Sequence, residues 1–228
     1  MSVLEIADAA FFDLTTDRAA NVSFLEGALK DDPQILWRLA RATYDLGLLE
    51  TTPLETKRSL AFERVTMTTK ALELAPDDPN VLKWAAIALS ATNEFENAKT
   101  KLINVVRIRS LFQRACDVGG DALCHHLLGR CCYQLADMTW MQRTAARALV
   151  SEVPTSTYEE ALRHFEACES KEPKTHKNNA FYMSQTLNKL KRKKEAKEWI
   201  QICILMPNTR GVTDEQLHAQ ALAFDKQL

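Results

Sequence analysis

Apolar residues recur along this chain with the period of amphipathic α-helices rather than that of β-strands. The clearest apolar stripe consists of Cys124, Leu127, Leu128, Cys131 and Leu135. These positions follow the spacing i, i+3, i+4, i+7 and i+11, which places the five side chains on one face of a helix. Another helical pattern runs through residues 94–118. Because the chain has only six glycines and seven prolines with which to form turns, the pattern predicts an all-α fold.

Three segments carry the signals of a helix start. Thr52-Pro-Leu-Glu55 and Ser156-Thr-Tyr-Glu159 have the order of a capping box, and Pro53 would stand at the first helical position. Thr213-Asp-Glu-Gln216 has the same order near the end of the chain. We therefore expect a helix to begin at each of these three segments.

A repeat relates several of the predicted helices. Pro173 and Pro207 are 34 residues apart, the length of a tetratricopeptide repeat. The positions that match the pattern of this repeat are Trp37, Tyr44, Ala71 and Pro76 in a first unit, and Leu128, Gly129, Ala161, Phe165, Cys168 and Pro173 in a later one. Gly129 would let the partner helix approach closely, and the segment 137–153 exceeds the repeat, which predicts an added helix. We expect tetratricopeptide-like, stacked antiparallel helix pairs with lengthened and extra helices.

The chain is predicted to have three regions. Residues 1–32 would form acidic N-terminal helices that pack on the array, residues 33–210 the repeat domain, and residues 211–228 a C-terminal capping helix. The acidic region has seven acidic residues against two basic ones. Its balance of −5 contrasts with a net charge of −1 for the whole chain, so the molecule is strongly polarised.

The opposite charge is concentrated in residues 189–197, "KLKRKKEAK", which hold six basic residues against one glutamate. We interpret this run as the turn between two helices of the last full repeat. The candidate contact residues are Lys189, Lys191, Arg192, Lys193, Lys194 and Lys197, with Lys174 and Lys177 from the neighbouring loop and helix start. Such a run can be a solvated turn, a nuclear import signal or a contact to an acidic polymer. We do not expect nucleic acid as the partner, because the run lacks aromatic residues that stack on bases.

A second basic set lies on the long helical pattern and consists of Arg107, Arg109 and Arg114. Arg107 and Arg114 are seven residues apart and share a helix face. These arginines are candidates for the concave side of the array, with pairing to neighbouring acidic residues as the alternative.

The stretch "CHHLLGRCC", residues 124–132, is the main candidate for metal or redox chemistry. Structural zinc sites normally use paired CxxC-type spacings, which this chain lacks. Adjacent Cys131 and Cys132 point about 100° apart on a helix, so we interpret the stretch as core and expect no metal, no cofactor and free buried thiols. Nucleotide-binding and hydrolase motifs are also missing from the sequence, so we expect no catalysis. The four tryptophans, Trp37, Trp84, Trp140 and Trp199, are expected to be core residues or wedges between helices.

No apolar run approaches the roughly 20 residues that a membrane helix needs. The first residues, "MSVLEIADAAFFDL", carry acidic residues where a secretory signal would carry positive charge. From these two features we expect a cytoplasmic protein without a membrane anchor.

Three segments resemble the regulator of microtubule dynamics family. They are "LWRLARATYDLG" (36–47), "LLGRCCYQLADMTWMQRTAARAL" (127–149) and "VPTSTYEEALRHFEACESKEP" (153–173). The likeness covers about residues 36–207. It implies a tetratricopeptide-like domain that associates with microtubules and the mitotic spindle. Some vertebrate members are longer and carry an N-terminal membrane anchor, whereas this chain is expected to be a compact soluble member.

The resemblance therefore implies a non-catalytic protein that binds tubulin or microtubules and influences microtubule dynamics and chromosome segregation. It also implies a place on the cytoskeleton, the spindle and the spindle poles, with other spindle or mitotic regulators as possible partners. The alternative is an adaptor that binds a peptide, or a lipid, in the concave groove. The two-carboxylate clamp of chaperone-binding relatives needs an asparagine where this chain has Ala42. We therefore do not expect this clamp here.

Overall fold

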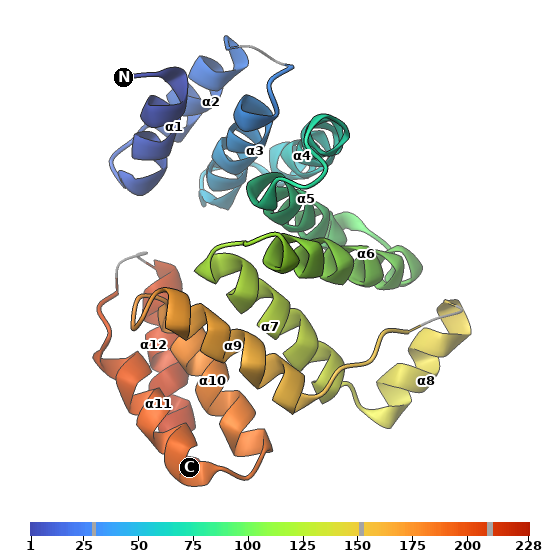
Figure 1. The fold of residues 1–228 in the computed structure, drawn as a ribbon, viewed down its shortest axis with the longest axis vertical. Helices are drawn as coiled ribbons and strands as arrows, with labels where there is room; N and C mark the ends of the chain where they lie inside the picture. Colours follow the sequence, from blue (N-terminus) through green and yellow to red (C-terminus); the bar gives the residue numbers. More distant parts are fainter. Residues whose placement is uncertain (29–30, 151–152, 209–211) are drawn as a thin grey trace. The chain divides into compact units, whose positions relative to one another are not determined.

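The computed structural model describes residues 1–28, 31–150, 153–208 and 212–228. These residues form twelve α-helices and one short 3-10 helix, with no strand among them, which confirms the all-α prediction. The chain divides into two compact units, Met1–Gly120 and Asp121–Leu228, and Figure 1 shows the helices of each. Our three predicted regions stay a prediction, and their second boundary, at residues 210 and 211, lies outside the described residues.

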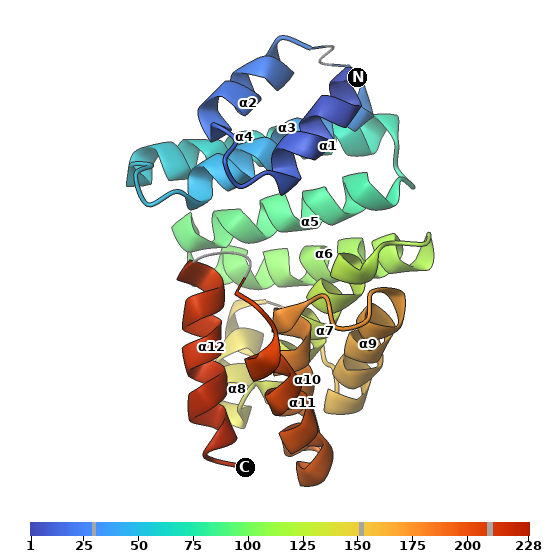
Figure 2. The ribbon, with the colours of Figure 1, turned by 90° about the vertical axis from the view of Figure 1, so that its left-hand side faces the viewer.

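The first unit is a succession of helices in which each packs on the next. Its elements are α1 (Val3–Phe12), α2 (Arg18–Glu26), α3 (Pro33–Leu48), α4 (Leu54–Leu74), α5 (Pro79–Thr92), the 3-10 helix η1 (Asn93–Phe95) and α6 (Ala98–Asp117). Helix α4 contacts both α3 and α5, and α5 contacts α6. Helices α1 and α2 pack on α3, and Figure 2 shows them as a further layer of this unit.

Two Asp-Pro pairs define helix starts in this unit. The Asp32 carboxylate accepts a hydrogen bond of 2.8 Å from the Gln34 amide before α3, and the Asp78 carboxylate accepts one of 2.8 Å from the Asn80 amide before α5. Each aspartate thus caps amides that the first turn leaves unpaired, and the following proline has no amide to satisfy. The expected box at Thr52 is wrong, because its hydroxyl donates to the Leu46 carbonyl (2.7 Å) and α4 starts after Pro53 with no side-chain cap.

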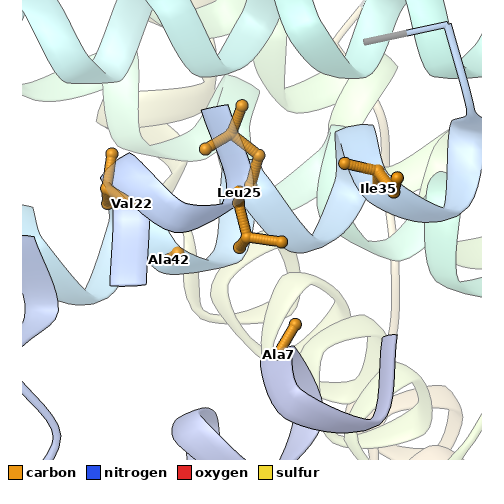
Figure 3. Close-up of a cluster of buried hydrophobic side chains, with 6 residues drawn as sticks. Ala7, Val22, Leu25, Ile35 and Ala42 are labelled. Atoms are coloured by element: carbon orange, nitrogen blue, oxygen red, sulfur yellow. The ribbon is translucent and has the colours of Figure 1, made fainter. Parts of the chain in front are cut away.

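The core of the first unit forms where α1, α2 and α3 meet. One buried cluster consists of Ala7, Val22, Leu25, Ile35, Leu39 and Ala42, most of them labelled in Figure 3. A second cluster joins Leu36 and Trp37 of α3 to Ala71, Val81 and Trp84. The prediction of core positions is confirmed for these two tryptophans, which are almost fully buried.

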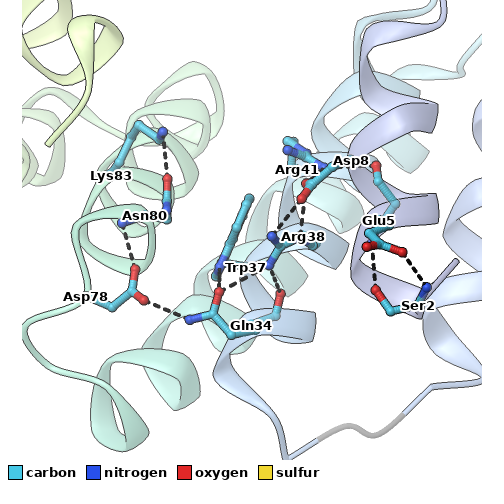
Figure 4. A network of polar contacts seen from close by, with 11 residues as sticks. Ser2, Glu5, Asp8, Gln34, Trp37, Arg38, Arg41, Asp78, Asn80 and Lys83 are labelled. Carbon is cyan, nitrogen blue, oxygen red and sulfur yellow. Dashed lines mark hydrogen bonds and ion pairs between the residues drawn. The ribbon is translucent and has the colours of Figure 1, made fainter.

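Asp8 holds the acidic N-terminal segment against α3. Its carboxylate pairs with Arg38 and Arg41 at 2.7 Å each, as Figure 4 shows. Arg41 also donates to the Ala7 carbonyl (2.9 Å). Burial by itself would raise the pKa of Asp8, but the hydrogen bonds and charges of the two arginines outweigh it and lower that pKa. One of the seven acidic residues of the segment 1–32 is therefore paired with arginines of α3 within the fold.

The second unit contains α7 (Ala122–Asp137), α8 (Trp140–Leu149), α9 (Tyr158–Lys171), α10 (Lys177–Lys189), α11 (Lys193–Leu205) and α12 (Val212–Asp225). Helices α7 and α9 are packed partners, and α9, α10, α11 and α12 follow as neighbours. Helix α8 is inserted between the partners α7 and α9 along the chain, as the extra length of segment 137–153 predicted.

Two other predicted helix starts belong to this unit. The α9 box is displaced by one residue, because the capping side chain is Thr157, which accepts from the Glu160 amide (3.1 Å). Helix α12 begins at Val212, before Thr213, so the predicted box at 213–216 is wrong. The residues that precede α12 lie outside the described part of the chain.

The contact between α7 and α9 is built around Gly129. A β-carbon placed on Gly129 would lie 2.7 Å from two ring carbons of Phe165, which is fully buried. Only a residue without a side chain allows this approach, so the prediction of a close contact at Gly129 is confirmed. The predicted stripe needs correction, because Leu127 and Cys131 are only half-buried, while Cys132 is fully buried together with Cys124, Leu128 and Leu135.

Candidate functional site

The basic run of residues 189–197 includes a sharp turn between α10 and α11. The Lys191 amide donates to the Asn188 carbonyl (3.0 Å) and the Arg192 amide to the Leu187 carbonyl (2.9 Å). This pair of bonds is the Schellman arrangement, in which the residue after the helix cap takes a left-handed conformation. Lys191 does so, with φ of 65°. The turn is therefore fixed by its backbone and carries its basic side chains on the outside.

Four consecutive basic side chains are exposed in this turn. They are Lys191, Arg192, Lys193 and Lys194, which we call the basic turn. Arg192 pairs with Glu195 through bonds of 2.7 Å and 2.5 Å. Among the ion pairs of the described residues, none involves the three lysines. The basic turn thus offers three ammonium groups and one partly neutralised guanidinium to a partner.

The two ends of the run are instead tied into the fold. Lys189 pairs with Asp137 at the end of α7, and the Tyr158 hydroxyl donates to the same carboxylate (2.6 Å). The hydrogen bond to Asp137 raises the pKa of Lys189. Lys197 pairs with Asp225 of α12 at 2.8 Å. These two lysines join neighbouring helices, and their charges are paired internally.

The other two candidates of this set lie elsewhere. Lys177 is buried at the start of α10, where its ammonium group donates to the Met206 carbonyl (2.8 Å) and to Asn208. Lys174 is exposed in the turn before α10, with φ of 54°. Since α10 has 13 residues and rises by 1.5 Å per residue, about 20 Å of helix separates Lys174 from the basic turn. The structure therefore does not bring these two lysines into the basic turn.

The arginines of α6 have three different environments. Arg107 is exposed and Arg109 is half-buried. The Arg114 guanidinium donates to the Pro76 carbonyl (2.8 Å) and lies 3.4 Å from the Asp77 carboxylate. For Arg114 these contacts agree with the alternative of pairing to a nearby acidic group. They connect α6 to the turn between α4 and α5. A role of this set in a concave groove stays a prediction.

Two features of the second unit were missed by sequence reasoning. Trp140 is 77% exposed and Met141 74% exposed at the start of α8, so the expectation that Trp140 is a core residue is wrong. Furthermore, Cys132 of α7 and the residues Glu160 and His164 of α9 place three possible metal-ligand atoms within 4.8 Å of one another. Only the i, i+4 spacing of Glu160 and His164 could have indicated this group from sequence.

None of the helices in residues 1–28, 31–150, 153–208 and 212–228 combines the length and the apolar character that crossing a bilayer requires. The six cysteines are thiols outside disulfides, and four of them are buried, whereas Cys116 and Cys131 are half-buried, so the expectation of buried thiols is confirmed only in part. Burial raises the pKa of Cys168 to about 12 and that of Cys203 to about 11, so both remain protonated at neutral pH.

Solved structures with a similar arrangement of helices are tetratricopeptide proteins. A thermophilic protein of this class from Thermus thermophilus aligns with a TM-score of 0.63 and 16% identity over 97% of each chain. MamA aligns with a TM-score of 0.52 and 13% identity, over 90% of this chain and 92% of its own. At this level of identity the likeness concerns the fold alone, and it confirms the tetratricopeptide-like architecture.

Sequence comparison is more specific. Regulator of microtubule dynamics protein 1 from mouse is 37% identical over 171 residues, which are 75% of this chain and 56% of the mouse protein. The protein of the same name from cattle is 34% identical over 199 residues, 87% of this chain and 62% of its own length. The chain therefore spans a little over half of these relatives. The family model described as "Regulator of microtubule dynamics protein 1-3" matches residues 3–228. This chain belongs to the regulator of microtubule dynamics family.

Proposed function

We propose that this protein binds microtubules without catalysing a reaction, and that the basic turn is part of the contact. The observation that carries the proposal is the exposed turn in a family named for the regulation of microtubule dynamics. Microtubules have an acidic surface and acidic tubulin tails, which attract a fixed cluster of cations. Fold and family are both of a regulator or adaptor type.

We narrow the proposed contact to fewer residues than the sequence analysis suggested. Lys189 and Lys197 are paired within the fold, Lys177 is buried, and Lys174 lies at the other end of α10. Lys191, Lys193 and Lys194 remain as exposed cations on a rigid turn. Exposed ion pairs contribute about 0.2–1 kcal/mol each. At about 0.5 kcal/mol each, the three lysines would add about 1.5 kcal/mol to binding, which is about a tenfold gain in affinity.

The proposal is tested by co-sedimentation of the purified chain with microtubules across a salt series. The turn variant combines Lys191→Gly, Lys193→Gln and Lys194→Gln, which keeps the pair between Arg192 and Glu195 and suits the left-handed backbone at position 191. We expect it to bind about tenfold more weakly than the parent at low salt. We also expect it to show a flatter salt dependence, because the Debye length shortens from about 10 Å at 0.1 M to 3 Å at 1 M.

A matched control removes the same charge elsewhere. Lys99, Lys101 and Lys226 are exposed lysines outside the basic turn, and their replacement by glutamine should leave binding near the parental level. Equal losses in the control and the turn variant would mean that net charge, not the turn, drives binding. A turn variant that binds like the parent at every salt concentration would reduce the turn to a solvated surface. A folded parent that does not co-sediment at all would favour the adaptor function.

We further propose that this contact influences microtubule growth or shrinkage, and thereby chromosome segregation, on the spindle and its poles in the cytoplasm. Tubulin is the partner, with other mitotic regulators as additional ones. Tagged parent and turn variant should differ in their enrichment on the spindles of dividing cells. Equal distribution of the two along spindle and cytoplasm would contradict this part of the proposal.

A further inference from the structure

We propose that Cys132, Glu160 and His164 form a binding site for a zinc ion between α7 and α9. The three side chains come from two helices that are direct packing partners in the second unit. Their ligand atoms, one sulfur, one carboxylate oxygen and one imidazole nitrogen, all lie within 4.8 Å of one another. The inference is independent of the microtubule contact, which uses other residues.

The backbone explains why these three side chains meet. Glu160 and His164 are four residues apart on α9, so they lie one above the other on the same helix face. Cys132 is three residues after Gly129 on α7, and Gly129 is the point where α7 meets Phe165, the neighbour of His164. The close approach at this glycine therefore brings the thiol of one helix within reach of two ligands on the other.

Neighbouring groups contact two of the three ligands. The Ser156 hydroxyl donates a hydrogen bond of 2.6 Å to the Glu160 carboxylate. The ring of His164 stacks on that of His125, with 6.2 Å between ring centroids and 28° between planes. A hydrogen bond such as that from Ser156 fixes the orientation of a ligating carboxylate and contributes to affinity. In a tetrahedral zinc site with bonds of about 2.0–2.3 Å, the ligand atoms are about 3.3–3.8 Å apart. The three atoms, now within 4.8 Å of one another, would therefore have to approach by up to about 1.5 Å on binding.

The chemistry of the set selects the type of cation. Calcium and magnesium prefer oxygen ligands alone, whereas zinc takes thiolate, imidazole and carboxylate together. Three protein ligands leave a fourth tetrahedral position for a water molecule. Cys132 is fully buried, while Glu160 and His164 are half-buried, so an ion enters from the carboxylate and imidazole side. On binding, the Cys132 thiol loses its proton to solvent and the thiolate bonds the zinc ion.

We expected no metal from the spacing of residues 124–132, all of which lie on the single helix α7. The proposed ligands are separated by 28 residues between Cys132 and Glu160, and only the packing of α7 on α9 joins them. A zinc ion there would connect the two helices and stabilise the second unit, since it binds the folded state alone.

The test uses the full chain, purified under reducing conditions and freed of metal by a chelator. Cobalt(II) is added as the probe, because thiolate coordination gives it a charge-transfer absorption in the near ultraviolet. We expect one cobalt ion per chain with this absorption, its displacement by zinc, and a higher unfolding midpoint with zinc than without. No thiolate absorption from the folded parent would overturn the proposal.

The variants identify the ligands. Cys132→Ser should lose the absorption, while Cys131→Ser, the matched control on the adjacent position, should keep it. His164→Gln and Glu160→Gln should each weaken cobalt binding at least tenfold, the lower end of what outer-sphere changes already cost. An absorption that survives Cys132→Ser would refute the site. If Cys132→Ser does not fold, His164→Gln decides, because unchanged affinity in this folded variant refutes it equally.

Discussion

The contact between Gly129 and Phe165 makes a sharp prediction about the second unit. Alanine in place of glycine within a helix ordinarily stabilises by about 1 kcal/mol. Here the new methyl group would lie 2.7 Å from Cδ1 and Cε1 and 3.1 Å from Cζ of Phe165. Carbon atoms in optimal contact are about 3.5–4.0 Å apart, so the ring would have to move by nearly 1 Å.

That movement is obstructed on the side of α9. Phe165 is fully buried, and so are Ala161 and Cys168 on the same helix. Forcing an extra methyl group into a packed core typically costs about 1–3 kcal/mol. The cost exceeds the gain in helix propensity, and we expect Gly129→Ala to lower the free energy of unfolding by about 1 kcal/mol.

The measurement is urea unfolding followed by the helical circular dichroism signal. Gly27→Ala is the matched control, because Gly27 has ordinary helical dihedral angles and its nearest neighbour is the Phe24 carbonyl oxygen at 3.4 Å. The control should be stabilising by about 0.4–1 kcal/mol. In a Phe165→Leu background, Gly129→Ala should lose its cost, with a coupling energy of about 1–3 kcal/mol.

A Gly129→Ala variant as stable as the control variant would refute the packing argument. So would additivity of Gly129→Ala and Phe165→Leu, because the cost is assigned to that one ring. Either result would mean that α7 and α9 adjust their separation at little cost. The repeat pattern would then describe a preference of the family rather than a steric requirement.

Three further predictions concern single positions. Lys191→Gly should raise the free energy of unfolding by up to about 1 kcal/mol, because glycine takes the left-handed conformation without strain; no gain in urea unfolding would contradict the described turn. Trp140→Ala should change stability by less than about 0.5 kcal/mol, whereas Trp37→Ala, a change in the core, should cost about 3–5 kcal/mol. Asp8→Asn should destabilise at neutral pH, and the difference from the parent should shrink as pH falls below about 4. The folded-state pKa of Asp8 is lowered, so its stabilisation is complete above the unfolded pKa of about 4 and is lost as pH falls through the folded pKa. A pH-independent difference between parent and Asp8→Asn would mean that the loss does not come from the charge of the carboxylate.

The fold could be predicted from the sequence because its main signals are local. Helical periodicity acts over a few residues, and the repeat positions Gly129, Ala161, Phe165 and Cys168 describe one helix contact that recurs in many proteins. Helix starts were less predictable. The Thr52 hydroxyl has a carbonyl acceptor in the preceding helix, and such competition is invisible in a capping pattern.

Exposure was predicted less well than helicity. Trp140 would be a core residue by its hydrophobicity, yet it starts the inserted helix α8, which has few neighbours. The apolar stripe on α7 shows the same difficulty, because Cys131 was predicted to be buried in it, whereas Cys132 is the buried residue and Cys131 is half-buried. A periodic pattern shows that a helix has an apolar face, but the neighbouring helices determine how much of it is covered.

The basic run shows why charge along a sequence overestimates the charge available to a partner. Lys189 is neutralised by Asp137, which lies 52 residues earlier, and Lys197 is paired with Asp225, which lies 28 residues later. Neither partner can be identified from the run itself. What the fold leaves exposed is a short turn whose conformation is fixed by the backbone hydrogen bonds of Lys191 and Arg192. Binding through so few rigid cations is weak for one molecule and falls with salt, so tight association with a lattice requires several copies or further contacts acting together.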